Sequence, residues 1–398
     1  MYQRKHPEFS TAADYVELSY EARRRLQEMA ADIDRAGEYP EAAMSLLEQM
    51  GFYDLSVPRS LGGVAADDAH EDAVAIARIL TNIAAGESST AQIWEFSRLM
   101  ALEALGPTSH LSEAAKNEIQ GRMAERPIRF CGTAAERYKK RFSYQMAIKP
   151  VEGGVLVNGT KYFATGVDGA DYAMAPGCLE GFPSFEEGGA HEVLIDLRSE
   201  GVHIHHDWDN MGQRATGSGA VTYEDVFVPD GFHWSRTVAQ STASPIGQAG
   251  LTCVLLGIGL GAVDALTHFV QHRESYPDAP RDPVIQFQLG EYLYRMKAAE
   301  LAVERSVELA VGHDVSGSPN LIEAIVAAHS AKLSLVDALM RVTSTMHNLC
   351  GGQSTAHLYD LDRFWRNART LASQDVLDLK QKGIAAWELL GEPPQGAR

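Results

Sequence analysis

The sequence has only four cysteines, and no two of them form a CxxC pair. They lie far apart along the chain, at Cys131, Cys178, Cys253 and Cys350. This spacing argues against a disulfide framework and against a structural zinc site. We therefore expect small buried thiols in a reducing compartment, and no metal.

Basic residues are scarce relative to acidic ones. The chain has 35 Lys and Arg against 53 Asp and Glu, a formal charge of −18, which would repel nucleic acids and anionic membranes. No apolar run approaches the roughly 20 residues that span a bilayer, and the first residues lack the apolar core of a signal peptide. We expect a cytoplasmic protein that binds neither nucleic acid nor membrane.

The 398 residues, 45% of them hydrophobic, can bury a large core and suggest two or three domains. Apolar residues recur at helical spacing in 1–126 and again in 235–398. Between them, in 127–234, short apolar runs alternate with glycine pairs, and Asn158-Gly159 indicates a hairpin. The pattern predicts an α+β fold with a β domain between two helical domains.

Near the end of the chain, Gly351-Gly352 is followed after 13 residues by Arg366-Asn367-Ala368-Arg369. This segment resembles the flavin-contacting segment of the acyl-CoA dehydrogenase superfamily. In the dehydrogenases this segment continues to a glutamate that removes the substrate α-proton. Here Gln374-Asp375 stands at that place. The resemblance implies a flavin scaffold whose usual base has been replaced.

A second segment, Asn158–Gly166, resembles the strand that contacts the flavin in this family. The match implies that Phe163 is an aromatic wall beside the isoalloxazine and that Thr165 is the partner of flavin N5. A flavin needs such a wall because its ring is apolar, together with a few polar groups for its nitrogens and carbonyls. Upstream, the family's Gly-Ser-Asp loop is missing, and Thr133 is the residue left to contact the flavin pyrimidine.

A third segment, Asp207–Gly219, is similar to the monooxygenase branch of the superfamily, which includes dibenzothiophene monooxygenase and related two-component flavin hydroxylases. The resemblance implies that Trp208 lines the flavin pocket and that Thr216 belongs to the same cofactor-binding segment.

The other cofactor contacts implied by the resemblance lie in the C-terminal domain. An arginine fork suits a phosphate, and a neighbouring subunit provides part of this contact in the family. Which arginine binds the phosphate stays open. The implied residues are Arg273, Arg281, Gln286, Asn348, Gly351, Gly352 and Arg369.

The candidate catalytic residues are Ser97, Gln374 and Asp375. Ser97 and Gln374 stand where the monooxygenase branch often has histidines. They can offer a hydrogen bond but cannot act as acid or base near neutral pH. We expect Trp94 and Phe96 to wall the substrate pocket.

The resemblance as a whole implies the acyl-CoA dehydrogenase fold, with an N-terminal helical domain, a middle β-barrel domain and a C-terminal four-helix bundle. It implies a homotetramer and a two-component monooxygenase. A separate flavin reductase supplies reduced FAD or FMN, and O2 reacts through a C4a-(hydro)peroxyflavin to oxygenate a small, aromatic or heteroaromatic, indole-like substrate. The alternatives are an acyl-CoA dehydrogenase with Asp375 as base, an amine N-hydroxylase or nitrososynthase, and a non-catalytic flavin-binding protein.

Overall fold

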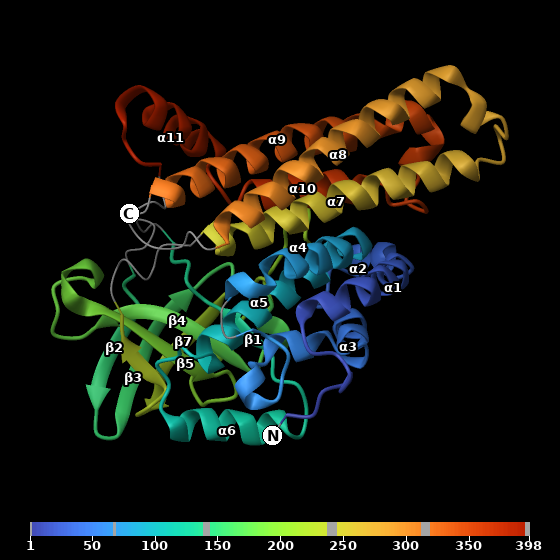
Figure 1. Ribbon diagram of the computed structural model, residues 1–398. Helices are drawn as coiled ribbons and strands as arrows, with labels where there is room; N and C mark the ends of the chain where they lie inside the picture. Colours follow the sequence, from blue (N-terminus) through green and yellow to red (C-terminus); the bar gives the residue numbers. More distant parts are fainter. Residues whose placement is uncertain (1, 67–68, 138–143, 237–244, 312–318, 395–398) are drawn as a thin grey trace.

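Helices begin and end the chain, and strands lie between them, as the sequence pattern predicts (Figure 1). The computed structural model describes residues 2–66, 69–137, 144–236, 245–311 and 319–394. The C-terminal helices form a long layer across the top of Figure 1. The N-terminal helices lie beneath one part of that layer and the sheet beneath another.

The N-terminal domain is built around α5, Ser88–Leu105, which is buried along most of its length. Its first turn is capped by Glu87, whose carboxylate accepts hydrogen bonds from the N–H groups of Ser89 and Thr90. The other helices are α1 Val16–Gln27, α2 Ala30–Ala36, α3 Glu41–Gln49, α4 Ala69–Gly86 and α6 Glu113–Met123. Short 3-10 turns cover Ala12–Tyr15, Phe52–Ser56 and Arg59–Leu61.

The middle domain is one mixed sheet of eight strands. Its hydrogen-bonded order is β6-β7-β3-β2-β4-β5-β8, with β1 parallel to β4. Among the described residues this order has two ends, so the domain that we predicted as a barrel is an open sheet. The strands are β1 Phe130–Gly132, β2 Ala147–Val151, β3 Gly154–Lys161, β4 Tyr172–Leu179, β5 Ala190–Asp196, β6 Val202–Ile204, β7 Val221–Pro229 and β8 His233–Ser235.

The hairpin that we predicted at Asn158-Gly159 was misplaced. The β2–β3 turn lies at Glu152-Gly153, and Asn158-Gly159 forms a bulge inside β3. The Asn158 side chain exchanges two hydrogen bonds of 2.9 Å with Asp225 on β7, which stabilises the bulge.

The C-terminal domain is a bundle of α7 Pro245–Gln271, α8 Pro283–Ala310, α9 Pro319–Cys350 and α10 Asp362–Ala372. A fifth helix, α11 Leu377–Leu390, packs on α9 (Figure 1). Short 3-10 turns at Ala279–Arg281 and Gly352–Thr355 join helices at one end of the bundle.

Our prediction that no apolar run approaches the length of a membrane span is wrong for helix α7. Its segment Ala249–Gln271 has 23 residues and a mean hydropathy of 1.9, so by length and composition it could span a membrane. However, 78% of this window is buried inside the protein, as in the core helix of a bundle. Its glycines allow close packing: a Cβ at Gly257 would lie 2.4 Å from Ala84 Cβ on α4.

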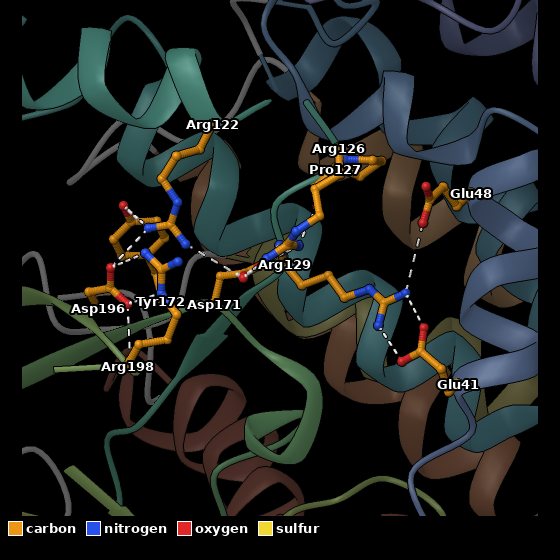
Figure 2. Close-up of polar contacts among 10 residues, drawn as sticks. All are labelled: Glu41, Glu48, Arg122, Arg126, Pro127, Arg129, Asp171, Tyr172, Asp196 and Arg198. Atoms are coloured by element: carbon orange, nitrogen blue, oxygen red, sulfur yellow. Dashed lines mark hydrogen bonds and ion pairs between the residues drawn. The ribbon is translucent and has the colours of Figure 1, made fainter. Parts of the chain in front are cut away.

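Ion pairs join the N-terminal helices to residues at the ends of β1 and β5 (Figure 2). The Arg129 guanidinium, just before β1, donates to both carboxylate oxygens of Glu41 on α3, at 2.6 and 2.8 Å. On α6, Arg122 donates to Asp196 at the end of β5, at 3.0 Å. The Asp171 carboxylate accepts the Arg129 backbone N–H at 2.9 Å. These contacts fix the sheet relative to the helical domain that carries α5.

Candidate functional site

A cavity of about 640 Å³ lies where α5, the sheet and the end of α10 meet. Its volume is in the range of sites that bind cofactors and small molecules. Its lining is mostly apolar and aromatic, with amides and hydroxyls among the polar groups. The lining residues are Phe96, Gly132, Ala134, Ala135, Phe163, Thr165, Trp208, Asn210, Met211, Ser218, Thr370, Ser373 and Gln374.

Two aromatic rings form one wall of this cavity. Phe163 and Trp208 pack edge to face, with centroids 6.2 Å apart and an interplanar angle of 86°. The Trp208 indole N–H donates to the backbone oxygen of Gln213 at 2.8 Å, which fixes the ring. Phe163 is 67% exposed and has a φ of 57°, a left-handed conformation that is rare for a bulky residue. The two residues that we predicted as a flavin wall thus line the same cavity.

The loop before β7 is fastened to α5 and α10 through Gln213, which is fully buried and has a φ of 50°. Its backbone N–H donates to Asn367 Oδ1 on α10 at 2.7 Å. Its backbone oxygen also accepts the Thr216 hydroxyl at 2.9 Å. A Cβ at the neighbouring Gly212 would lie 2.0 Å from the Arg366 oxygen, so only glycine fits there. The segments around 213 and 367, far apart in sequence, therefore meet beside the cavity.

Of the three candidate catalytic residues, the structure places only Gln374 in the cavity. Ser97 is buried, and its hydroxyl accepts the backbone N–H of Phe130 at 3.0 Å, so it joins α5 to β1. Phe96, the preceding residue, does line the cavity, since successive helical side chains point about 100° apart. The role that we predicted for Ser97 does not agree with this position.

Asp375 is tied to two lysines rather than directed at the cavity. Its carboxylate lies 2.9 Å from Lys332 Nζ on α9 and 3.0 Å from Lys380 Nζ on α11. The two ammonium groups outweigh the effect of burial and lower the pKa of Asp375 to about 2. A carboxylate held this firmly in its ionised form is a weak proton acceptor. This geometry does not support Asp375 as the base of a dehydrogenase.

Three further candidates are buried and bonded elsewhere. The Thr133 backbone N–H donates to Met174 O at 2.8 Å, and the Thr133 side chain is buried inside the sheet domain. Its neighbours Gly132 and Ala134 line the cavity, whereas Thr133 does not. Trp94 is fully buried and donates to the Phe52 oxygen at 3.3 Å, so it belongs to the core rather than to a substrate pocket. Thr216 is buried beneath the cavity wall.

Apart from Arg369, the other candidate cofactor residues form a second group at the far end of the C-terminal domain. Figure 1 shows the α7–α8 and α9–α10 connections at one end of the bundle and the α10–α11 turn at the other. Arg273 lines a second cavity there, of about 780 Å³, between the N-terminal helices and the bundle. Its guanidinium would lie 3.4 Å from a Cβ at Gly351. The same end holds Gly352, Arg281, Gln286 and Asn348, and Arg369 is exposed on α10.

These outer residues have their own contacts within the chain. Arg281 lies 3.4 Å from Asp278 and is largely exposed. The Gln286 side chain donates to the Pro280 oxygen at 2.9 Å. Neither lines the 640 Å³ cavity, so one chain does not gather all the predicted cofactor contacts in one place.

Sequence reasoning missed several residues of the site. Gln213 and Asn367 lie inside segments that carried the resemblance, but nothing in those segments singled them out. Gln92 is a buried amide on α5, one turn before Phe96, and its helical neighbours gave no signal. Ser218, Asn210, Met211, Thr370 and Ser373 were also not predicted.

Two family profiles match the chain and together span more than half of it. The acyl-CoA dehydrogenase N-terminal domain matches residues 18–126, and the acyl-CoA dehydrogenase C-terminal domain matches residues 249–378.

Relatives match across nearly the whole chain. A dibenzothiophene monooxygenase of Mycolicibacterium goodii is 27% identical and covers 96% of this chain and 94% of its own length. A probable FMNH2-dependent monooxygenase, SfnC, of Pseudomonas putida is 24% identical, with 92% of each covered.

Among solved structures, TdsC from Paenibacillus sp. A11-2 in complex with FMN and indole has the same fold. The TM-score is 0.83 at 20% identity, and the match covers 97% of this chain and 100% of that one. From the two profiles, the chain belongs to the acyl-CoA dehydrogenase superfamily, and the two relatives above bear the names of monooxygenases.

Proposed function

We propose that this protein is the oxygenase component of a two-component flavin-dependent monooxygenase. It takes reduced flavin, FMN by analogy with its relatives, from a separate reductase and uses O2 to oxygenate a small aromatic or heteroaromatic compound. The observation that carries the proposal is the cavity in which Phe163, Trp208 and Gln374 come together from three segments. The family membership supports the same conclusion.

The donor set of the cavity fits a flavin. Two aromatic rings offer an apolar wall, and the Thr165 hydroxyl and the Gln374 amide offer polar contacts at its edge. When bound, a reduced flavin supplies the electrons that activate O2. The amides and hydroxyls do not ionise near neutral pH, so the residues of the cavity bind and orient their ligands by hydrogen bonds rather than by acid–base chemistry.

The apolar wall has a second task, which is to keep water away. Phe96, Phe163, Trp208 and Met211 surround the polar groups with hydrophobic surface. Excluding water protects a reactive oxygen species from decay and holds the substrate close to it. Flat rings such as indole or dibenzothiophene suit this lining, and the names of the relatives agree with an aromatic substrate.

We also propose that the protein is a cytoplasmic homotetramer in which a second copy completes each flavin site. Arg273 and its neighbours lie outside the cavity of their own chain, where an arginine could hold the phosphate of a flavin bound to another copy. Helix α8 offers a surface for such contacts, since Phe287, Tyr294 and Leu301 are 78%, 61% and 56% exposed.

A reductase-coupled assay under 18O2 tests the proposal. The protein is mixed with FMN, NADH and a flavin reductase and offered indoles, thiophenes and amines, and products are analysed by mass spectrometry. We expect one 18O atom in a product of an aromatic substrate. Labelled amine products alone would instead support an N-hydroxylase.

Two variants connect the assay to the cavity. Phe163→Ala, in the aromatic wall, should uncouple the reaction, so that most of the NADH consumed yields H2O2 instead of oxygenated product. Phe227→Ala is the matched control, because Phe227 is an exposed aromatic on β7 outside this cavity. If the fraction of NADH that yields oxygenated product were equal in both variants, the assignment of this cavity as the active site would be wrong.

A further inference from the structure

A third cavity, of about 120 Å³, lies where α5 packs against α4 and α7, and we call it the α5–α7 cavity. It shares no lining residue with the 640 Å³ cavity, although both reach α5. Phe96 lines the larger cavity, whereas Glu95, Arg98 and Leu99 line the α5–α7 cavity. Helical side chains three and four residues apart lie on one face, so the two cavities meet neighbouring faces of the same helix.

A buried ion pair lines the α5–α7 cavity. Arg98 Nε donates to Glu95 Oε2 at 2.9 Å, and Arg98 Nη2 donates to Glu95 Oε1 at 3.1 Å. The two residues are only 8% and 5% exposed. Removing two charges from water costs free energy that their mutual attraction offsets only in part. Stability alone therefore does not explain why this pair lies at a cavity.

Small residues on the neighbouring helices leave the space beside the ion pair open. Gly250 on α7 faces the Glu95 carboxylate, since a Cβ at this position would lie 2.7 Å from Glu95 Oε1. On α4, Ala73 and Ala77 line the cavity with short side chains. A larger side chain at one of these positions would occupy the cavity.

One nitrogen of the Arg98 guanidinium is left over for a ligand. The group has five N–H donors, and Glu95 takes one from Nε and one from Nη2. Within the described residues, Nη1 donates to no acceptor, and it is not sealed off from water-sized molecules. Because the Arg98 side chain lines the cavity, Nη1 can donate to a molecule inside it.

The charges at the cavity favour a neutral ligand. The positive charge of Arg98 is already balanced by Glu95. Asp72, the other carboxylate of the lining, lies 3.9 Å from Arg59. An anion would add a negative charge beside these two carboxylates, whereas a carbonyl or hydroxyl oxygen accepts a hydrogen bond and adds no charge.

The remaining lining and the volume limit the rest of the ligand. Aliphatic side chains such as Ile76, Leu80 and Leu102 form much of the wall. A dry cavity of about 150 Å³ lined by such side chains can hold benzene. The α5–α7 cavity is slightly smaller, so its ligand should have an apolar body of about six non-hydrogen atoms.

We propose that the α5–α7 cavity is a further ligand-binding site, in which Arg98, held by Glu95, donates to the carbonyl or hydroxyl oxygen of a small, uncharged, mostly apolar molecule. The site lies outside the 640 Å³ cavity and needs no flavin, so it goes beyond the proposed function.

Cyclopentanone is the probe, and its binding to the flavin-free protein is measured by ligand-detected NMR titration. Methylenecyclopentane has nearly the same shape without an acceptor oxygen, and cyclopentanecarboxylate carries a negative charge. We expect cyclopentanone to bind at least about tenfold more tightly than either, which is the effect of one hydrogen bond from a charged donor. Equal or tighter binding of the hydrocarbon or of the carboxylate overturns the proposal.

Ala77→Leu fills the cavity and leaves the ion pair unaltered. It should weaken cyclopentanone binding at least about tenfold, because the leucine side chain takes the place of the ligand. Ala114→Leu is the matched control, since Ala114 is exposed on α6 and does not line this cavity. Equal binding to both variants would mean that the ketone binds elsewhere, and the proposal would fail.

The double variant Glu95→Leu/Arg98→Met tests the ion pair itself. Replacing both partners by apolar side chains is tolerated better than removing one of them. Its affinity for cyclopentanone should fall to that for methylenecyclopentane. Should it fail to fold, Arg98→Lys replaces it, because an ammonium keeps the charge beside Glu95 but lacks the fork that presents Nη1. If the folded variant still preferred the ketone as strongly as the unaltered protein, Arg98 would not be the donor.

Crystals soaked in cyclopentanone locate the ligand directly. We expect the ketone oxygen within hydrogen-bond distance of Arg98 Nη1. A ketone found only in the 640 Å³ cavity would contradict the proposal.

Discussion

Replacing Asp375 by asparagine should weaken the protein locally without removing a catalytic base. The Asp375 carboxylate lies about 3 Å from the ammonium groups of both Lys332 and Lys380, and these two side chains are only 7% and 9% exposed. Asparagine is nearly isosteric but neutral, so it leaves two buried cations close together. The loss of stability should be greatest where α11 packs on α9.

The magnitude follows from the pKa. Asp375 has a pKa of about 2 in the folded protein against an ordinary value of 3.8. Nearly two pKa units correspond to about 2.5 kcal/mol of stability. Because the folded-state pKa is depressed, this contribution is present above about pH 4 and is lost as the pH falls through about 2. With the cost of the unpaired lysines, we expect a loss of about 3 kcal/mol near pH 7.

Hydrogen exchange monitored by mass spectrometry, with a thermal melt, measures this effect. In Asp375→Asn, amides of α11 should exchange faster and the first unfolding transition should move to lower temperature. Asp378→Asn is the matched control, because Asp378 is an exposed carboxylate on the same helix. In the unaltered protein and in Asp375→Asn alike, acyl-CoA thioesters added without oxygen should leave the bound flavin oxidised.

If Asp375→Asn were as stable as the unaltered protein, the two ion pairs of Asp375 would not stabilise the packing of α11. If acyl-CoA bleached the flavin of the unaltered protein and not that of the variant, Asp375 would act as a base.

Three further outcomes are expected. Arg273→Ala should weaken FMN binding by about 10- to 100-fold in a dialysis assay and leave riboflavin binding unchanged, because only FMN carries the phosphate; equal losses for both ligands would contradict this. Trp208→Leu should weaken binding of both flavins about tenfold, and an unaltered affinity would exclude Trp208 from the wall. Gly212→Ala should lower the melting temperature of the apoprotein, because a Cβ would lie 2.0 Å from the Arg366 oxygen; an unchanged melt would show that this contact can relax.

Much of the fold could be predicted from the sequence because helical periodicity and short strands leave distinct patterns. The patterns did not fix local geometry. Asn158-Gly159 has the composition of a hairpin turn, yet the contact between Asn158 and Asp225, 67 residues apart, makes it a bulge. For α7, composition alone could not distinguish a core helix from a membrane span.

Phe163, Trp208 and Gln374, which were predicted from the segments that carry the resemblance, line the cavity, and their roles remain predictions. The sequence did not indicate residues whose position depends on how a helix is rotated. Helix α5 is buried on nearly all sides, so its sequence gave no preferred face. Ser97 was predicted from its place in the resemblance, whereas nothing in the sequence indicated Gln92, whose amide bonds to Gln213 and Thr165.

The decisive test of the monooxygenase function is to mix the complex of protein and reduced FMN with oxygenated buffer in a stopped-flow instrument. Oxygen uptake and the absorbance of oxidised flavin are followed together. We expect an interval in which oxygen has been consumed and the oxidised-flavin spectrum has not yet returned, and Trp208→Leu should shorten this interval. Simultaneous oxygen uptake and flavin oxidation at the rate of free flavin, with stoichiometric H2O2, would show that the protein is not a flavin-dependent monooxygenase.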